Sequence, residues 1–119
     1  MALADASWTR PNVDVDRMGE HAREASELLK ALAHEGRLMI LCDLMRGEKS
    51  VGELEALLSR RQASVSQQLA RLRLEGLVST RRDGKTIYYS IASDKARSVI
   101  GALYASFCAT DGGRPPGRL

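Results

Sequence analysis

Four short, uncharged side chains that form hydrogen bonds gather close together in the sequence: Ser64, Ser66, Gln67 and Gln68. Amides and hydroxyls of this kind suit the edges of base pairs in the major groove of duplex DNA. A helix that only faces solvent normally carries Lys and Glu at such positions. The cluster therefore favours sequence-specific contact with duplex DNA.

Basic residues are concentrated around this cluster. From Ser59 to Lys85 the chain has seven Lys and Arg residues against two acidic ones, a charge of +5, so the remainder carries −2 within the total of +3. Such a concentration is typical of a protein whose partner is a polyanion. A hydrated arginine-rich surface is the alternative, and next to the hydrogen-bonding cluster it is the weaker explanation.

The residues before the cluster predict the first helix of a helix-turn-helix. Ser50 and Glu53 have the spacing of a capping box, in which each side chain accepts a hydrogen bond from a backbone N–H at the start of a helix. Three leucines then follow at helical spacing and give this helix an apolar face: Leu54, Leu57 and Leu58. Residues 59–62 interrupt the pattern and are expected to form the turn.

The second helix of the motif is expected over residues 63–75, with the polar cluster at its amino-terminal end. Its inward residues are Val65, Leu69 and Leu72, and Gly76 is its expected stop. In helix-turn-helix proteins the second helix enters the major groove and its first residues contact the bases. This helix is therefore the predicted reader of DNA sequence.

A β-hairpin is predicted directly after the reading helix. Residues 77–82 and 86–91 are rich in β-forming side chains, and Asp83-Gly84 between them is a strong hairpin signal. A hairpin in this position is a wing, placed to contact phosphates or the adjacent minor groove. Its basic residues are Arg81, Arg82 and Lys85.

Two helices are expected before the motif. The first begins at Asp14 or Asp16, runs to about Ala33, and has a narrow apolar stripe that favours a contact between subunits: Met18, Ala22, Ala25, Leu29 and Leu32. The second begins at His34, which is expected to be an N-terminal turn residue, and ends at Gly47. Cys42 lies within its apolar stripe, so burial is the default explanation for this cysteine.

One more helix is expected after the wing, beginning at Ser93-Asp94. Its apolar stripe consists of Ala96, Val99, Ile100, Leu103 and Phe107. Cys108 lies about 100° round the helix from Phe107 and is less fully explained by packing than Cys42. The predicted fold is thus mainly α with a two-stranded β wing, a winged helix-turn-helix domain over residues 14–110. Residues 1–13 are expected to be a mobile arm and residues 111–119 a disordered tail.

The sequence has no apolar run of about 18 residues and no secretion signal, so a cytoplasmic protein without membrane contact is expected. Its two cysteines would then be reduced at rest, and a disulfide between them would be transient. The chain shows no nucleophile–base pair and no Gly-rich phosphate loop, and we expect neither an enzyme nor a cofactor.

The order of elements and three sequence motifs resemble the ArsR/SmtB family of bacterial repressors. The motifs are LAHEGRLMIL at residues 32–41, SVSQQLARL at residues 64–72 and DGKTIYY at residues 83–89. The resemblance implies a homodimer, paired through the first and last helices, that blocks transcription until an inducer lowers its affinity for operator DNA. By the resemblance and the charge pattern, the expected DNA-binding residues are Gln62, Ser64, Ser66, Gln67, Arg71, Arg82 and Lys85.

Members of this family differ in what they sense. The arsenic-type site needs cysteines in the helix before the reader, where residues 49–54 have none, and the zinc-type site needs His and carboxylate ligands along the last helix, where only Asp94 is present. The remaining pattern, Cys42 and Cys108, resembles the persulfide-sensing branch, the BigR/SqrR-like repressors. In that branch the two thiols join through a disulfide or polysulfide bridge, and genes for sulfide oxidation are derepressed.

Three alternatives stay open from the sequence. The same two cysteines would also respond to peroxide or another thiol oxidant, because all of these reagents act on a thiolate. A metal site built from Cys42, Cys108, His21 and His34 is a weaker possibility, since metals of this kind need three or four N or S ligands. A winged helix that binds only protein would not need the +5 segment.

Overall fold

The structure, a computed structural model, describes residues 12–58 and 65–109. Its elements are α1 (Val15–Leu32), α2 (Glu35–Leu44), β1 (Lys49–Ser50), α3 (Val51–Leu58), α4 (Val65–Leu74), β2 (Val78–Asp83), β3 (Thr86–Ile91) and α5 (Asp94–Phe107). The predicted winged helix-turn-helix is confirmed. Most of the expected arm over residues 1–13, the tail over residues 111–119, and the predicted DNA-binding residues Gln62 and Ser64 lie outside the described residues.

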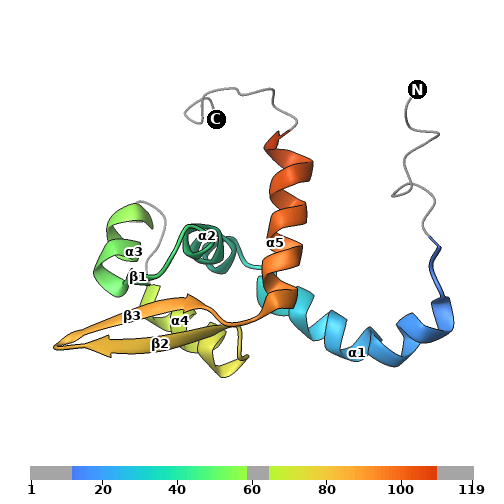
Figure 1. The fold of residues 1–119 in the computed structure, drawn as a ribbon, viewed down its shortest axis with the longest axis horizontal. Helices are drawn as coiled ribbons and strands as arrows, with labels where there is room; N and C mark the ends of the chain where they lie inside the picture. The colour runs from blue at the N-terminus through green and yellow to red at the C-terminus, as the bar shows by residue number, and fades with distance from the viewer. Residues whose placement is uncertain (1–11, 59–64, 110–119) are drawn as a thin grey trace.

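Helices α2, α3 and α4 pack with the small sheet into one body, while α1 and α5 extend away from it (Figure 1). The centre of the core is formed by six fully buried aliphatic side chains: Ile40, Leu41, Leu54, Leu69, Leu72 and Ile100. They come from α2, α3, α4 and α5, so one apolar cluster anchors every helix of the motif together with the last helix.

Side-chain caps fix where the helices begin. Asp14 accepts a hydrogen bond from the backbone N–H of Arg17, and Ser93 accepts one from Ala96. The expected capping box is confirmed, because Ser50 N–H donates to Glu53 Oε1 at 2.8 Å and Glu53 N–H donates to Ser50 Oγ at 3.1 Å. These reciprocal bonds satisfy N–H groups that would otherwise lack partners at the start of α3.

The wing is the antiparallel pair β2–β3, in which Asp83 lies opposite Thr86. Asp83 is thus the last strand residue and the turn is Gly84-Lys85, one position later than the sequence pattern indicated. Gly84 has a φ of +67°, which a glycine adopts without strain. The two residues of β1 pair with β3 and make the sheet three-stranded, in the order β1-β3-β2. This short edge strand was not predicted.

Four large apolar side chains of the expected stripes are exposed instead of buried, and the most exposed of them is Phe107 of α5, at 71%. Leu57 of α3 is 52% exposed, because the inward face of this short helix is defined by Leu54 and Leu58 alone. Met18 and Leu29 of the α1 stripe are also more than half exposed, although Leu32 at the end of the same helix is buried. The α1 stripe therefore packs on the domain only at its carboxyl end and leaves an apolar face without cover in the single chain.

Candidate functional site

Helix α4 holds the predicted reading residues at the surface. Val65, Leu69 and Leu72 are buried at helical spacing, so Ser66 and Gln67 between them point to solvent and are exposed. A helix anchored on one face and carrying hydroxyl and amide groups on another can place those groups against base edges. The predicted readers Ser66 and Gln67 are thus accessible in the structure.

Gln68 differs from its neighbours. Its side chain is half-buried, and its Oε1 accepts a hydrogen bond from the Arg37 guanidinium of α2 at 3.1 Å. The amide that appeared in the sequence to be part of the outward cluster is therefore already engaged within the protein. No local sequence pattern predicts this pairing, because the two residues are 31 positions apart.

Arg71, another predicted DNA-binding residue, lies further along α4. Its Nε donates to Glu75 Oε2 at 3.0 Å, and 46% of its side chain is exposed. An exposed ion pair of this geometry contributes about 0.3–0.5 kcal/mol and exchanges readily for another anion. Arg71 therefore stays available to a phosphate.

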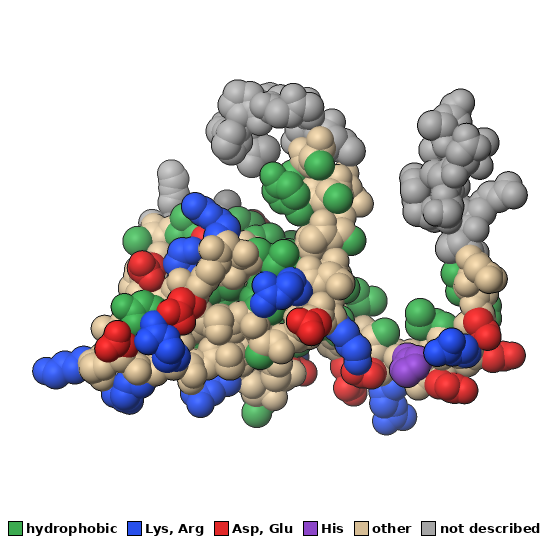
Figure 2. All heavy atoms as spheres, in the orientation of Figure 1, with side chains coloured by type: hydrophobic (Ala, Val, Ile, Leu, Met, Phe, Trp, Pro, Cys, Tyr) green, Lys and Arg blue, Asp and Glu red, His purple; other side chains and the backbone are tan. Residues whose placement is uncertain are grey.

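The basic residues of the wing fall into two groups. Arg81 donates two hydrogen bonds to the carboxylate of Glu48, and its guanidinium lies 4.8 Å from the centre of the Tyr88 ring. The Glu48 carboxylate, through these hydrogen bonds, raises the pKa of Arg81 above its ordinary value. Arg82 and Lys85 are exposed near the turn, and Figure 2 shows basic side chains at the far end of the wing. Arg82 and Lys85 are thus accessible near the turn, whereas the guanidinium of Arg81 is engaged by Glu48.

Cys42 and Cys108, the two predicted sensing residues, lie on different helices, and both thiols are free. Cys42 is on α2 and half-buried, whereas Cys108 caps the carboxyl end of α5 and is exposed. The pKa of the Cys42 thiol is raised, first by burial and then by the negative charge of the Cys108 thiolate and of Asp43. The two cysteines are 66 positions apart in the sequence (108 − 42), on helices α2 and α5 that contact each other.

Asp43 is a buried carboxyl group that the sequence reading did not single out. Its side chain is 5% exposed, and its Oδ1 lies 3.6 Å from Lys49 Nζ and 3.7 Å from Arg46 Nη1. A buried carboxylate is costly without opposite charge nearby, and these two cations supply it. Asp43 therefore places a fixed negative charge beside Cys42, which opposes formation of the thiolate.

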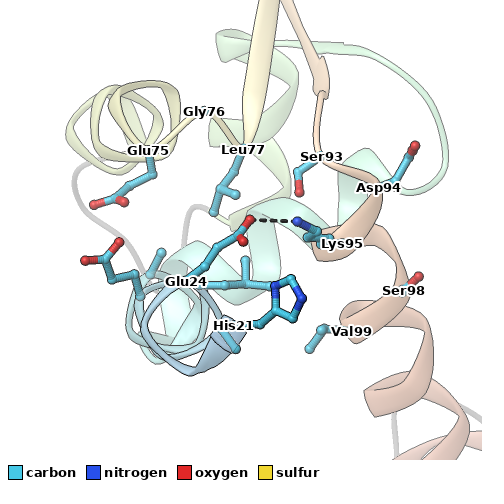
Figure 3. A pocket seen from close by; sticks show the side chains of 14 residues that line it. His21, Glu24, Glu75, Gly76, Leu77, Ser93, Asp94, Lys95, Ser98 and Val99 are labelled. Atoms are coloured by element: carbon cyan, nitrogen blue, oxygen red, sulfur yellow. Dashed lines mark hydrogen bonds and ion pairs between the residues drawn. The ribbon is translucent and has the colours of Figure 1, made fainter. Parts of the chain in front are cut away.

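A groove of about 930 Å³ opens where α1 and α5 meet the link between α4 and β2. In Figure 3 the carboxylate of Glu24 reaches the Lys95 ammonium, at 2.7 Å, and this contact lowers the pKa of Glu24. Three more carboxylates line the groove: Glu27, Glu75 and Asp94. Excess negative charge does not suit a DNA backbone, so the groove lining does not favour DNA as its ligand.

The histidines do not join the cysteines in a metal site. His34 Nδ1 accepts hydrogen bonds from the N–H groups of Gly36 and Arg37, so this ring caps α2 as expected, and His21 lines the groove. Within residues 12–58 and 65–109, no group of three or more His, Cys, Asp or Glu side chains is arranged to hold a metal ion. Among the same residues, no helix combines the length and apolar character of a membrane span.

Comparison with known proteins identifies a family and several relatives that this chain resembles. A family model described as bacterial regulatory protein, arsR family, matches residues 34–80. The chain is 52% identical over 99 residues to the biofilm growth-associated repressor of Agrobacterium fabrum, which covers 83% of this chain and 85% of the relative. The crystal structure of the transcriptional repressor BigR from Xylella fastidiosa matches with a TM-score of 0.76 at 45% identity, over 81% of this chain and 98% of that chain. Reduced HlyU from Vibrio cholerae matches with a TM-score of 0.71 at 42% identity, over 77% and 97% of the two chains.

Proposed function

The chain belongs to the ArsR family of bacterial regulatory proteins and is a DNA-binding transcriptional repressor, and we propose that thiol chemistry at Cys42 and Cys108 controls its affinity for operator DNA. The proposal is supported by the placement of the two cysteines on α2 and at the end of α5, two helices that contact each other. The inducer is persulfide or another reactive sulfur species, and its arrival derepresses genes of sulfide oxidation.

The repressor acts as a homodimer that pairs through α1 and α5. Large apolar side chains on these helices are more than half exposed in the single chain: Met18, Leu29, Tyr104 and Phe107. Covering this surface with a second copy removes apolar area from water, at about 25 cal/mol for each Å². Two copies also carry two reading helices, which a two-fold operator with half-sites about 34 Å apart requires.

In this dimer α4 reads the operator. Ser66 and Gln67 contact base edges, together with the predicted reader Ser64, and Gln62 is a further DNA contact. Arg71, Arg82 and Lys85 contact phosphates and hold the dimer on the duplex. Base contacts then set specificity, while phosphate contacts supply affinity that falls steeply with salt.

The chemistry of release begins at the exposed thiol. A Cys108 thiolate takes the outer sulfur from a persulfide R–S–SH, which gives Cys108–S–SH and R–S⁻. Attack by the Cys42 thiolate on the inner sulfur then gives a Cys42–Cys108 disulfide and HS⁻. If Cys42 also carries a persulfide, the same attack gives a trisulfide and HS⁻. Each added sulfur lengthens the bridge, which relaxes the limit of about 7 Å between Cα atoms of a direct disulfide.

Closure of the bridge links the dimer helix α5 to α2. Helix α2 packs directly on α4, so a shift of α5 relative to α2 is passed to the reading helix. A loss of operator affinity of 10- to 100-fold needs only about 1.4–2.7 kcal/mol of coupling.

Two serine variants test the proposal. Cys42→Ser and Cys108→Ser should each bind a duplex selected by the wild-type protein from a randomised library, yet fail to release it on treatment with a persulfide donor. Mass spectrometry in parallel should find the bridge only in wild-type protein. Full release from either single variant would rule out the bridge.

Further measurements test the identity of the inducer and the oligomeric state of the protein. Peroxide is the second inducer to test, since it oxidises the same thiols; release by peroxide but not by persulfide would assign the site to peroxide sensing. Light scattering at micromolar concentration should give the mass of a dimer in the reduced state, and a monomer would contradict the pairing of α1 and α5.

A further inference from the structure

The guanidinium of Arg37 joins three helices. Its Nε donates to the backbone carbonyl of Ala31 at 2.6 Å and its Nη2 donates to the carbonyl of Lys30 at 3.4 Å, both in the last turn of α1. Its Nη1 donates to Gln68 Oε1 of α4 at 3.1 Å. Arg37 itself stands in the first turn of α2. One side chain thus links the end of α1 to the reading helix.

The positive charge of Arg37 interacts with backbone carbonyls at the carboxyl end of α1. The last carbonyls of a helix lack partners within the helix and carry partial negative charge, so a cation there is favourable. The pKa of Arg37 is lowered by burial and then by the positive charge of Arg71. Arg37 is half-buried, and its guanidinium is directed at carbonyl and amide oxygens of the neighbouring helices.

Gly36 lies beside Arg37 and leaves room for the side chain that caps α2. A Cβ added at Gly36 would lie 3.1 Å from the His34 ring, which is a tight contact, and 3.9 Å from Gln68 Cγ, which is an ordinary van der Waals contact. A larger residue at Gly36 would therefore press on the His34 ring, while α4 could keep its place beside the start of α2.

We propose that Arg37 is a positioning residue for DNA reading, which fixes the rotation of α4 about its own axis by holding Gln68 against the end of α1. The inference rests on the proposed role of α4 as the reader. The buried stripe of α4 sets its distance from the core, but a single apolar stripe tolerates small rotations about the helix axis. A directed hydrogen bond from Arg37 to the flank of the helix removes that freedom.

The size of the effect follows from helix geometry. Side-chain tips lie about 5–6 Å from the axis of an α-helix, so a 10° rotation of α4 moves the tips of Ser66 and Gln67 by about 1 Å. A base hydrogen bond loses most of its strength over such a displacement, because donor–acceptor distances beyond about 3.5 Å no longer count as bonds. Loss of the Arg37–Gln68 contact should therefore reduce discrimination between sequences and leave attraction to phosphates unchanged.

The test measures binding of each variant to two duplexes: one selected by the wild-type protein from a randomised library, and a scrambled duplex of equal composition. Arg37→Met and Gln68→Ala should each lower the ratio of the two affinities about tenfold, the range expected for one lost base contact. Affinity for the scrambled duplex and its dependence on salt should not change. The double variant should lose no more than either single variant, since both remove the same contact.

Two control variants test whether the effect is specific to the Arg37–Gln68 contact. Gln68→Glu keeps an acceptor for Arg37 and should keep the affinity ratio, even though its charge weakens binding to both duplexes. Arg23→Met removes an exposed cation of α1 and should leave the ratio unchanged. If Arg37→Met fails to fold, by circular dichroism, the Gln68 variants decide the matter alone.

Several outcomes would overturn the proposal. These are an unchanged ratio in Gln68→Ala, a loss in Gln68→Glu equal to that in Gln68→Ala, or additive losses in the double variant. Equal weakening of both duplexes with a shallower salt dependence would make Arg37 a phosphate contact instead. Wild-type protein that prefers no duplex would refute the reading role of α4 itself. A wild type that discriminates, and loses discrimination in Gln67→Ala but not in Gln68→Ala, would refute the Arg37 inference alone.

Discussion

Closing the bridge between Cys42 and Cys108 should make the protein harder to unfold while it weakens operator binding. A cross-link over 66 positions (108 − 42) restricts the unfolded chain, and the loop-closure relation gives about 4 kcal/mol for a loop of this length at 25 °C. Any strain that the bridge imposes on the packing of α5 against α2 reduces this gain. We therefore expect the free energy of unfolding of the bridged protein to rise by about 2–4 kcal/mol.

The assay compares reduced and bridged protein in urea at one fixed protein concentration, because the stability of a dimer depends on concentration. Operator affinity is measured on the same two samples by fluorescence anisotropy. Cys42→Ala, treated with the same persulfide donor, is the control and should change in neither measurement.

Two results would refute the reasoning. A bridged protein less stable than the reduced one would mean that the bridge does not fit the native packing of α2 and α5. A bridged protein that is more stable and still binds operator with unchanged affinity would mean that the thiol pair is a staple and not a switch.

Three further predictions concern the core, the wing and the titration of Cys42. Leu69→Ala, at a fully buried position of α4, should cost about 2–5 kcal/mol of stability in urea unfolding. Arg82→Ala and Lys85→Ala should each weaken binding to the operator and to a random duplex by the same factor. Each should also reduce the slope of log affinity against log salt concentration by about one, which anisotropy titrations over a salt series measure. Because burial raises the pKa of Cys42 in the folded state, the folded protein keeps this proton to higher pH than the unfolded chain. The free energy of unfolding should then fall as the pH rises above about 8.5, and it should fall less in Cys42→Ala. Urea unfolding at a series of pH values measures both.

The local features of this fold could be predicted because neighbouring residues determine them. The Ser50–Glu53 capping box, the His34 cap and the buried stripe of α4 each depend on residues three or four positions apart. The hairpin follows in the same way from a short turn between two β-forming runs, with its turn displaced by one residue. The short strand β1 carries no such signal, since two residues have no measurable period.

The contacts that set the function of individual side chains could not be predicted, because they join residues far apart in the chain. Gln68 and Arg81 had the types expected of DNA contacts, yet Arg37 engages the first and Glu48 the second. Likewise, helical phase placed Cys108 at the margin of an apolar stripe, but the contact of α5 with α2, the helix that carries Cys42, joins parts far apart in the chain. Residue type thus indicated the chemistry available, and tertiary packing decided which groups remain available for a partner.

Helix α2 is the element through which the proposed thiol bridge and the proposed reading contacts meet. It has ten residues, which makes it about 15 Å long. Cys42 follows Arg37 by five positions, so the two side chains lie about 140° apart around the helix axis. Arg37 therefore holds α1 and α4 from a different face of α2 than the one that carries Cys42. In the proposed mechanism, α2 moves as one short body, so a displacement of Cys42 by the bridge would also displace Arg37. The Arg37–Gln68 hydrogen bond is 3.1 Å long and is lost beyond about 3.5 Å, so a shift of a few tenths of an ångström would release α4 to rotate.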